Sequence, residues 1–321
     1  MPALVIAVFL IACSGTWLAR RYALHRQLVD QPGARRSHAV ATPRGGGIAI
    51  VVAILLALSA AALGWPGLAP LLWLAAIGLV CVAGIGWIDD HRPLSPWSRL
   101  GVHVLAAGWL GAGVALVGAP IWIAAVVAML ALGLVNVWNF MDGINGLATS
   151  HAVSSATAFL AIALIAACLG FLPFNAPRAR IFLGDVGSGA LGYLIALLAA
   201  LVLIEEARTG VLLALPLSAF LVDAALTLAS RMLRGEQWWK PHVQHVYQQC
   251  VQRHHPHLRV AGAYLAWTVS AILLMTMTSD QPPAFIMVTT VTWYAFAVAC
   301  WFWLRRRHRR WVAINAKDDA R

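Results

Sequence analysis

The stretch LLWLAAIGLVCVAGIGWIDD, residues 71–90, decides the fold class. Residues 71–88 carry no charged side chain, and the apolar run ends at Asp89 and Asp90. A helix needs ~20 apolar residues to cross the hydrocarbon layer of a bilayer, and it satisfies its own backbone polar groups there. This stretch is therefore predicted to span a membrane and to carry two carboxylates at one of its surfaces.

The rest of the chain repeats this pattern. Hydrophobic residues make up 61% of the 321 residues and charged residues only 11%, whereas soluble domains carry about 25% charged residues. A soluble core of this length could not bury so many apolar side chains. We therefore predict an all-α, polytopic membrane bundle of about ten spans, forming one integral membrane domain over residues 1–321. The apolar stretches lie at residues 1–19, 46–64, 68–88, 100–118, 121–138, 149–174, 187–204, 211–230, 260–278 and 283–304.

Basic residues gather on one side of this predicted bundle. The net charge is +11, and every Lys and Arg except Arg208 falls in the loops 20–44, 89–99, 175–184 and 231–259 or in the tail 305–321. Basic loops stay on the cytoplasmic side of a membrane. The excess of positive charge is thus explained by membrane orientation and not by nucleic acid binding. The histidine-containing loop, residues 232–259, and the basic tail, residues 305–321, are both predicted to be cytoplasmic.

The segment 149–174 breaks the alternation of sides. It must leave the loop that contains Asp142 and return to the same face at Arg178 and Arg180. Its ~26 residues make ~39 Å of helix, enough for one crossing but not for two. A re-entrant hairpin and the loss of one helix are both open.

Several acidic residues are placed where charge is costly. Ionisable groups at membrane depth are usually functional. Carboxylates on one face would repel one another without a cation, and Mg²⁺ suits carboxylate and phosphate ligands, with Mn²⁺ as the alternative. Each carboxylate could instead simply end a helix at the interface. The residues concerned are Asp89, Asp90, Asp142, Asp185 and Asp223.

Two segments combine polar side chains with glycine. Asn136 and Asn139 are three residues apart and lie on one helical face, just before residues 142–146 (DGING). The glycines there let backbone approach a ligand. Residues 182–188 (FLGDVGS) open the next predicted helix, and a glycine-flanked helix N-terminus with a carboxylate and a hydroxyl suits metal and phosphate.

Two basic segments offer anion-binding groups. His242 and His245, in residues 240–248 (KPHVQHVYQ), could donate hydrogen bonds to a diphosphate or stack on a base. A solvated loop in contact with anionic lipid is the alternative, and a zinc site is disfavoured because the acidic residues suit a harder ion. Arg44, in residues 43–47 (PRGGG), could hold an anionic head group through its guanidinium fork. Membrane orientation alone would also explain an arginine there.

Taken in order, these segments resemble the polyprenyl-phosphate N-acetylhexosamine-1-phosphate transferases of glycosyltransferase family 4, which include the phospho-MurNAc-pentapeptide translocase. The resemblance implies transfer of an N-acetylaminosugar 1-phosphate from a UDP-sugar to undecaprenyl phosphate, with release of UMP, at the cytoplasmic face of a bacterial inner membrane. Residues 242–248 look most like the branch that initiates lipopolysaccharide O-antigen units. The matching segments are residues 42–47 (TPRGGG), 89–90 (DD), 139–143 (NFMDG) and 182–188 (FLGDVGS).

The resemblance also implies roles for single residues. Asp89, Asp90 and Asp185 would be catalytic; Asp185 and Asp90 would bind Mg²⁺, and Asp89 or Asp90 would hold or deprotonate the lipid phosphate. The lipid phosphate would attack the β-phosphorus, with an aspartyl-phosphate intermediate as the competing route. Many relatives have Asp at position 145, where Asn145 brings a carbonyl but no charge. The substrate-binding residues would be Arg44, Asn136, Asn139, Asp142, Asn145, Asp223, His242, His245 and Tyr247.

Two other function classes are open at this stage. A transporter also uses intramembrane carboxylates, but its site lies near the midplane between repeated halves; these carboxylates gather at one face, and no internal repeat is evident. A catalytically inactive scaffold or lipid-binding relative would fit if a helix is missing at 149–174 and Asp185 is displaced. The sequence leaves open the sugar, the prenyl chain length and the oligomeric state, monomer or homodimer.

Overall fold

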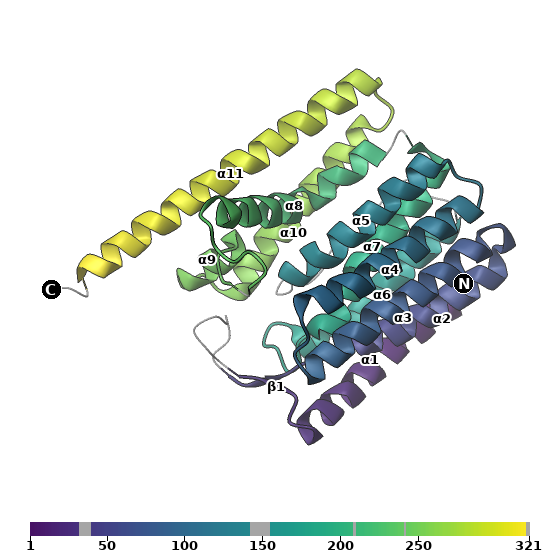
Figure 1. Ribbon diagram of the computed structural model, residues 1–321, viewed down its shortest axis with the longest axis horizontal. Helices are drawn as coiled ribbons and strands as arrows, with labels where there is room; N and C mark the ends of the chain where they lie inside the picture. Colours follow the sequence, from purple (N-terminus) through teal and green to yellow (C-terminus); the bar gives the residue numbers. More distant parts are fainter. Residues whose placement is uncertain (32–39, 142–154, 208–209, 241, 319–321) are drawn as a thin grey trace. The chain divides into compact units, whose positions relative to one another are not determined.

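The chain is a helical membrane bundle (Figure 1), as predicted. The computed structural model describes residues 1–31, 40–141, 155–207, 210–240 and 242–318. Nine helices in these residues are long and apolar enough to cross a membrane, and α2 is a shorter apolar helix. The helices are α1 (Pro2–His25), α2 (Ile48–Gly64), η1 (Pro66–Leu68), α3 (Ala69–His91), α4 (Pro96–Leu116), α5 (Ile121–Phe140), α6 (Ser155–Asn175), α7 (Gly184–Glu205), α8 (Gly210–Leu233), α9 (Val246–Gln252), α10 (His257–Thr278) and α11 (Pro283–Asp318).

Each of the ten predicted apolar stretches contains most of one long helix. The short helix α9 was not predicted, because it lies within the polar loop 232–259. A two-stranded antiparallel ribbon, β1 (Val29–Asp30) and β2 (Thr42–Pro43), joins the end of α1 to the start of α2.

The described residues divide into two compact units. Among the described residues, unit 1 contains those within 1–31 and 41–210, and unit 2 contains Val40 and those within 211–318. Each unit is described by itself below. The expectation of one integral membrane domain stays a prediction.

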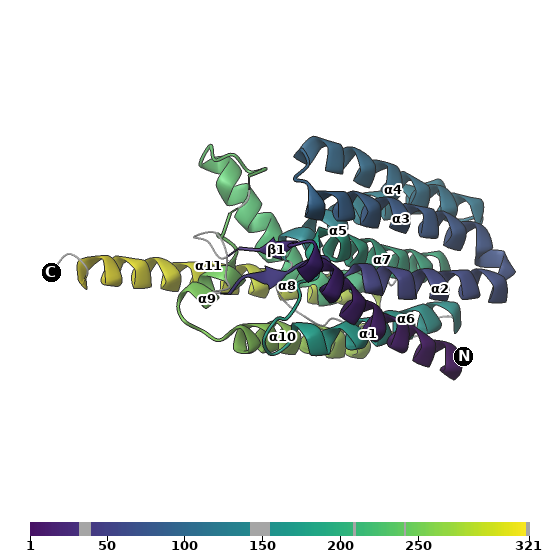
Figure 2. The same cartoon turned by 90° about the horizontal axis from the view of Figure 1, so that it is seen from below.

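In unit 1, the helices α1 to α7 pack side by side, with α3 and α5 both against α7 (Figures 1 and 2). Small residues allow the backbones to approach closely, as in other membrane bundles. A Cβ on Gly86 would lie 2.5 Å from the carbonyl oxygen of Asp185, and a Cβ on Gly47 would lie 2.2 Å from the Cα of Gly187. These glycines therefore bring α2 and α3 directly against the first turn of α7.

The break in alternation lies between α5 and α6. The end of α5 is beside α7, because Ser188 donates a hydrogen bond to Asn139. The start of α6 is at the opposite end of the bundle, where Ser155 accepts a hydrogen bond from the indole of Trp65, just after α2. The two helices thus run in the same direction. Residues 155–175 form a single helix without reversal, which excludes a re-entrant hairpin within them; residues 149–154 lie outside the described residues.

Unit 2 has its own apolar contacts between α8, α9, α10 and α11. One cluster joins Leu215 on α8 to Met275 on α10 and Ile286 on α11. A second cluster joins Val222 on α8 to Val246 on α9 and Trp301 on α11. The short helix α9 is therefore packed against membrane helices and is not a free surface loop.

Candidate active site

Two of the glycine-containing motifs are bound to each other by backbone hydrogen bonds. The amide of Phe182 donates to the carbonyl of Pro43 (2.7 Å), and the amide of Gly46 donates to the carbonyl of Phe182 (2.9 Å). The amide of Gly47 donates to the carbonyl of Leu183 (2.8 Å). Residues 42–47 and 182–188, far apart in the sequence, thus form one structure at the start of α7.

Asp90 caps this start of α7. Its carboxylate is buried and accepts hydrogen bonds from the amides of Asp185 (3.2 Å) and Val186 (3.3 Å). A carboxylate is favoured there by the positive end of the helix dipole. Gly184 has φ +76, and a Cβ on it would lie 2.5 Å from Asp90 Oδ2, so this contact requires glycine.

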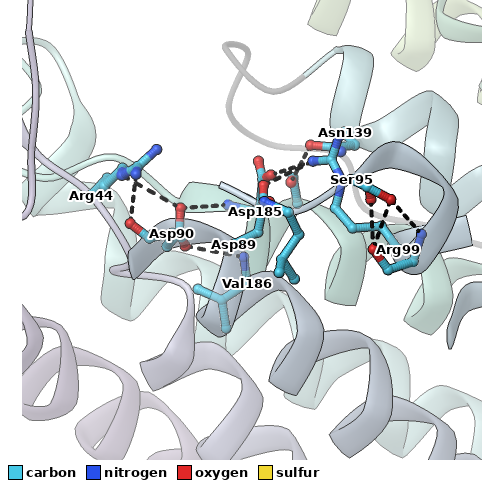
Figure 3. A network of polar contacts seen from close by, with 11 residues as sticks. Arg44, Asp89, Asp90, Ser95, Arg99, Asn139, Asp185 and Val186 are labelled. Carbon is cyan, nitrogen blue, oxygen red and sulfur yellow. Dashed lines mark hydrogen bonds and ion pairs between the residues drawn. The ribbon is translucent and has the colours of Figure 1, made fainter. Parts of the chain in front are cut away.

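Arg44 lies on the other side of Asp90. Its guanidinium donates to the backbone carbonyl of Asp90, and its Nε lies 3.8 Å from Asp90 Oδ1. The arginine predicted to hold an anionic head group thus contacts a predicted catalytic residue (Figure 3). Its guanidinium is partly exposed and retains donors for a phosphate.

Asp89 and Asp185 share one cation. Arg99 Nη1 donates to Asp89 Oδ2 (2.9 Å) and to Asp185 Oδ2 (2.8 Å), as Figure 3 shows. The second oxygen of Asp89 accepts the amide of Leu94 (2.6 Å), at the turn between α3 and α4. The three side chains are partly exposed: 26% for Arg99, 13% for Asp89 and 31% for Asp185. Solvent or a ligand can therefore reach the shared point.

Arg99 was missed by the sequence analysis, which counted it only among the basic residues of the loop 89–99. Its position is set by the start of α4. Ser95 caps this helix by accepting the amide of Ser98 (3.2 Å), and Pro96 occupies the first helical position. The only available signal was a cation in the first turn of a helix that follows two aspartates.

Asn139 also reaches the start of α7. Its side-chain carbonyl accepts a hydrogen bond from the hydroxyl of Ser188 (3.2 Å), which is fully buried. Asn136 instead donates to the carbonyl of Leu132 in its own helix (2.7 Å). The predicted substrate-binding residues Asp142 and Asn145 lie outside the described residues.

The remaining predicted residues belong to unit 2. The rings of His242 and His245 stack with centroids 4.8 Å apart, and the ring of Tyr247 follows 6.0 Å from that of His245. Burial, together with the nearby His245 and Arg231, lowers the pKa of His242 to about 4. A neutral imidazole has one donor and one acceptor nitrogen, so at neutral pH His242 can donate a single ring hydrogen bond.

Asp223 is the one predicted substrate-binding carboxylate in unit 2. It is buried, at 2% exposure, and accepts hydrogen bonds from neutral donors on four helices. Its surroundings differ in kind from those of Asp89 and Asp185. Its substrate-binding role stays a prediction.

The donor set in unit 1 fits a magnesium ion. The carboxylate oxygens of Asp89 and Asp185 converge on one nitrogen atom of Arg99, and hard oxygen donors are the ligands of Mg²⁺. No group of three or more His, Cys, Asp or Glu that could enclose a metal ion occurs in the described part of the chain. Mg²⁺ is usually held by one or two carboxylates together with substrate phosphates, not by an all-protein cage.

Comparison with known proteins places this cluster in a family. The family model of glycosyl transferase family 4 matches residues 71–203, the stretch from α3 to α7 that contains Asp89, Arg99 and Asp185. Over these residues the chain is similar to glycosyl transferase family 4. The predicted resemblance to this family, the predicted enzyme class of phosphotransferase and the multi-pass membrane location are thereby confirmed, and the transporter alternative is set aside.

Curated proteins are similar to this chain beyond these residues. The decaprenyl-phosphate N-acetylglucosaminephosphotransferase of Mycobacterium tuberculosis is 28% identical over 297 residues, covering 74% of this chain and 72% of that protein. The undecaprenyl-phosphate alpha-N-acetylglucosaminyl 1-phosphate transferase of Thermotoga maritima is 31% identical over 175 residues, covering 53% and 56%. The phospho-N-acetylmuramoyl-pentapeptide-transferase of Deinococcus radiodurans is 33% identical over 187 residues, covering 47% and 59%.

Proposed function

We propose that this chain transfers an N-acetylaminosugar 1-phosphate from a UDP-sugar to undecaprenyl phosphate and releases UMP. The observation that carries this proposal is the convergence of Asp89 and Asp185 on one cation position beside the N-terminus of α7. Such a point suits the diphosphate of a nucleotide sugar, because the helix end and a bound cation both stabilise negative charge. The names of the relatives, which include polyprenyl-phosphate N-acetylglucosamine phosphotransferases, support the polyprenyl-phosphate acceptor and the N-acetylaminosugar.

The reaction is an exchange at the β-phosphorus of the donor. An oxygen of the lipid phosphate forms the new bond to this phosphorus, and the bond to the oxygen of UMP breaks. Mg²⁺, when bound by Asp185 and Asp89, would neutralise charge on the diphosphate. Catalysis then depends on positioning and charge, because phosphoryl transfer asks little other chemistry of a protein.

Three residues of unit 1 are proposed to have separate roles in this reaction. Arg44 is proposed to hold the lipid phosphate, since its guanidinium fork is partly exposed beside Asp90. Arg99 is proposed to contact the donor diphosphate once the carboxylates bind the metal. Asp90 was predicted as a metal ligand from sequence; because both its oxygens accept amides of α7, we propose that it orients the start of α7 instead.

The side of the membrane follows from charge. The ends of α1, α3 and α6 nearest this cluster are flanked by arginines, among them Arg20, Arg92 and Arg180. Under the positive-inside rule this end faces the cytoplasm, where UDP-sugars are made. We propose a bacterial inner membrane enzyme of this orientation and, from the resemblance of residues 242–248, a first step in O-antigen synthesis.

The position of Asp185 supports the active enzyme over the inactive-scaffold alternative. It required that a missing crossing between α5 and α6 displace Asp185. Although these two helices run in the same direction, Asp185 still shares Arg99 with Asp89. The described residues therefore bring Asp185, Asp89 and Arg99 together.

The test is UMP release by the purified protein in detergent. The assay contains undecaprenyl phosphate and a panel of UDP-N-acetylhexosamines, with Mg²⁺, with Mn²⁺ or with EDTA. We expect release that needs the lipid, is abolished by EDTA and occurs with one donor above the others. No release with any donor, from protein shown to be folded, would contradict the proposal and return weight to the scaffold alternative.

A further inference from the structure

Asp223, on α8, is the most extensively hydrogen-bonded side chain in the described part of unit 2. Oδ1 accepts from Thr227 Oγ1 (3.1 Å), Val246 N (2.9 Å) and Trp301 Nε1 (3.2 Å). Oδ2 accepts from Tyr264 Oη (3.1 Å) and Tyr247 N (3.5 Å). The donors come from α8, α9, α10 and α11. One carboxylate thus connects all four helices of this unit.

These contacts use the whole accepting capacity of the group. An ionised carboxylate offers about four lone-pair sites, and the five donors already exceed that number. A metal ion or a nucleotide could bind Asp223 only by displacing one of the donors. Its side chain is also only 3% exposed. The structure therefore argues against direct contact between Asp223 and a substrate.

The donors that matter for function are the amides of Val246 and Tyr247. They form the first turn of α9, directly after His245, whose own amide donates to the side chain of Gln248 (3.2 Å). The ring of His245 is nearly buried, and its Nδ1 lies 3.7 Å from Asp223 Oδ1. His242 stacks on this ring. Asp223 thus determines where the backbone and the ring of His245 lie.

A second carboxylate, that of Glu236, holds the loop 232–259 through more exposed contacts. Glu236 accepts hydrogen bonds or ion pairs from Arg231 (2.7 Å), Arg234 (2.6 Å) and Gln244 (2.8 Å). These contacts are partly exposed, and exposed pairs add little to stability. The buried attachment of His245 is the one through Asp223.

We propose that Asp223 is a positioning residue: it holds the first turn of α9 and the ring of His245 so that the His242–His245 stack is preformed for the donor substrate. The substrate named here rests on the proposed function. The positioning itself does not, because it concerns contacts within unit 2 alone.

The test compares Asp223→Asn with Ser218→Ala in the full-length protein in detergent. Asn keeps the size of the side chain but replaces one accepting carboxylate oxygen with a donating NH₂ group. This group then faces the donor of a backbone amide or a hydroxyl, with which it cannot form the original hydrogen bond. Ser218 is a matched control, because it is also fully buried on α8 and accepts from the indoles of Trp267 and Trp293. Both of these hydrogen bonds come from α10 and α11, and neither involves His245 or α9.

We expect hydrogen exchange in the peptide containing Val246 and Tyr247 to become about tenfold faster in Asp223→Asn, since the loss of an acceptor opens this turn. Diethylpyrocarbonate modification of His245, followed by mass spectrometry, should accelerate as well. Ser218→Ala should leave both rates as in the parent. Parental rates in folded Asp223→Asn would overturn the proposal.

Tyr264→Phe serves where Asp223→Asn fails to fold. It removes one donor and keeps the carboxylate, so a smaller acceleration in the same direction supports the proposal, and parental rates contradict it. In the UMP assay, Asp223→Asn should raise the KM for the UDP-sugar by more than it lowers kcat. If no UMP is released by the parent, while the exchange rates respond as described, the proposed function fails and the positioning role stands.

Discussion

Asp185 and Asp223 are both aspartates on membrane helices, yet their surroundings are opposite. The side chain of Asp185 is 31% exposed and shares a single arginine nitrogen with Asp89. The side chain of Asp223 is 3% exposed and is surrounded by five neutral donors. A carboxylate whose lone pairs are all used by fixed donors holds protein segments in place. Two carboxylates that share one cation can still bind a second cation.

The difference also separates two kinds of energetic role. Removing a saturated buried carboxylate leaves several donors unpaired, and the cost appears in local order. Removing a carboxylate from the shared pair relieves repulsion within the cluster but deletes a ligand for an incoming ion. Stability and activity should therefore respond in different proportions to substitutions in the two regions.

The largest effect is expected for Asp185→Asn. We expect UMP release to fall by at least about 10²-fold, because charge stabilisation in phosphoryl transfer depends on the bound cation. The melting temperature should change little. Asp280→Asn, the same chemical change at an exposed site between α10 and α11, is the control and should keep parental turnover. Near-normal activity of Asp185→Asn would contradict the proposed metal-binding role of Asp185, and with it the functional contrast between Asp185 and Asp223.

Arg99→Met should have the next largest effect, and in two directions. Without the guanidinium, Asp89 and Asp185 lose their shared cation, so Mn²⁺ measured by electron paramagnetic resonance should bind about tenfold more tightly. UMP release should nevertheless fall, because Arg99 is proposed to contact the donor. Arg99→Lys keeps the charge and should bind Mn²⁺ as the parent does. Weaker Mn²⁺ binding in Arg99→Met would show that the arginine supports the metal site.

Gly184→Ala tests how the start of α7 positions Asp185. A Cβ there would lie 2.5 Å from Asp90 Oδ2 at a φ of +76, so a loss of about 1–3 kcal/mol in unfolding free energy is expected. Gly84→Ala, in α3, has nothing within 4 Å of the added Cβ and should be neutral or stabilising by up to about 1 kcal/mol. Thermal unfolding of the two variants measures the difference. Equal melting temperatures would show that the contact with Asp90 does not require glycine at position 184.

The sequence predicted the helices of both regions because apolar length alone specifies a membrane span. It also indicated the importance of the aspartates, since charge at membrane depth is rare. It could not separate Asp185 from Asp223, because the difference depends on Tyr264 and Trp301, which are 41 and 78 residues further along the chain. Arg99 was missed for a similar reason: its role depends on how α4 packs beside α7, and a count of charges treats every arginine alike.

The smallest effect concerns the pH dependence of the loop that Asp223 holds. Burial lowers the pKa of His242 to about 4 from 6.5, so the folded protein binds fewer protons at this residue than the unfolded chain does between these two values. Its contribution to stability is therefore present above pH 6.5 and is lost as the pH falls toward 4. Limited proteolysis of the loop 232–259 should accelerate between pH 7 and pH 5 in the parent and less so in His242→Gln. An equal acceleration in both proteins would show that the stacked ring of His242 is not the titrating group.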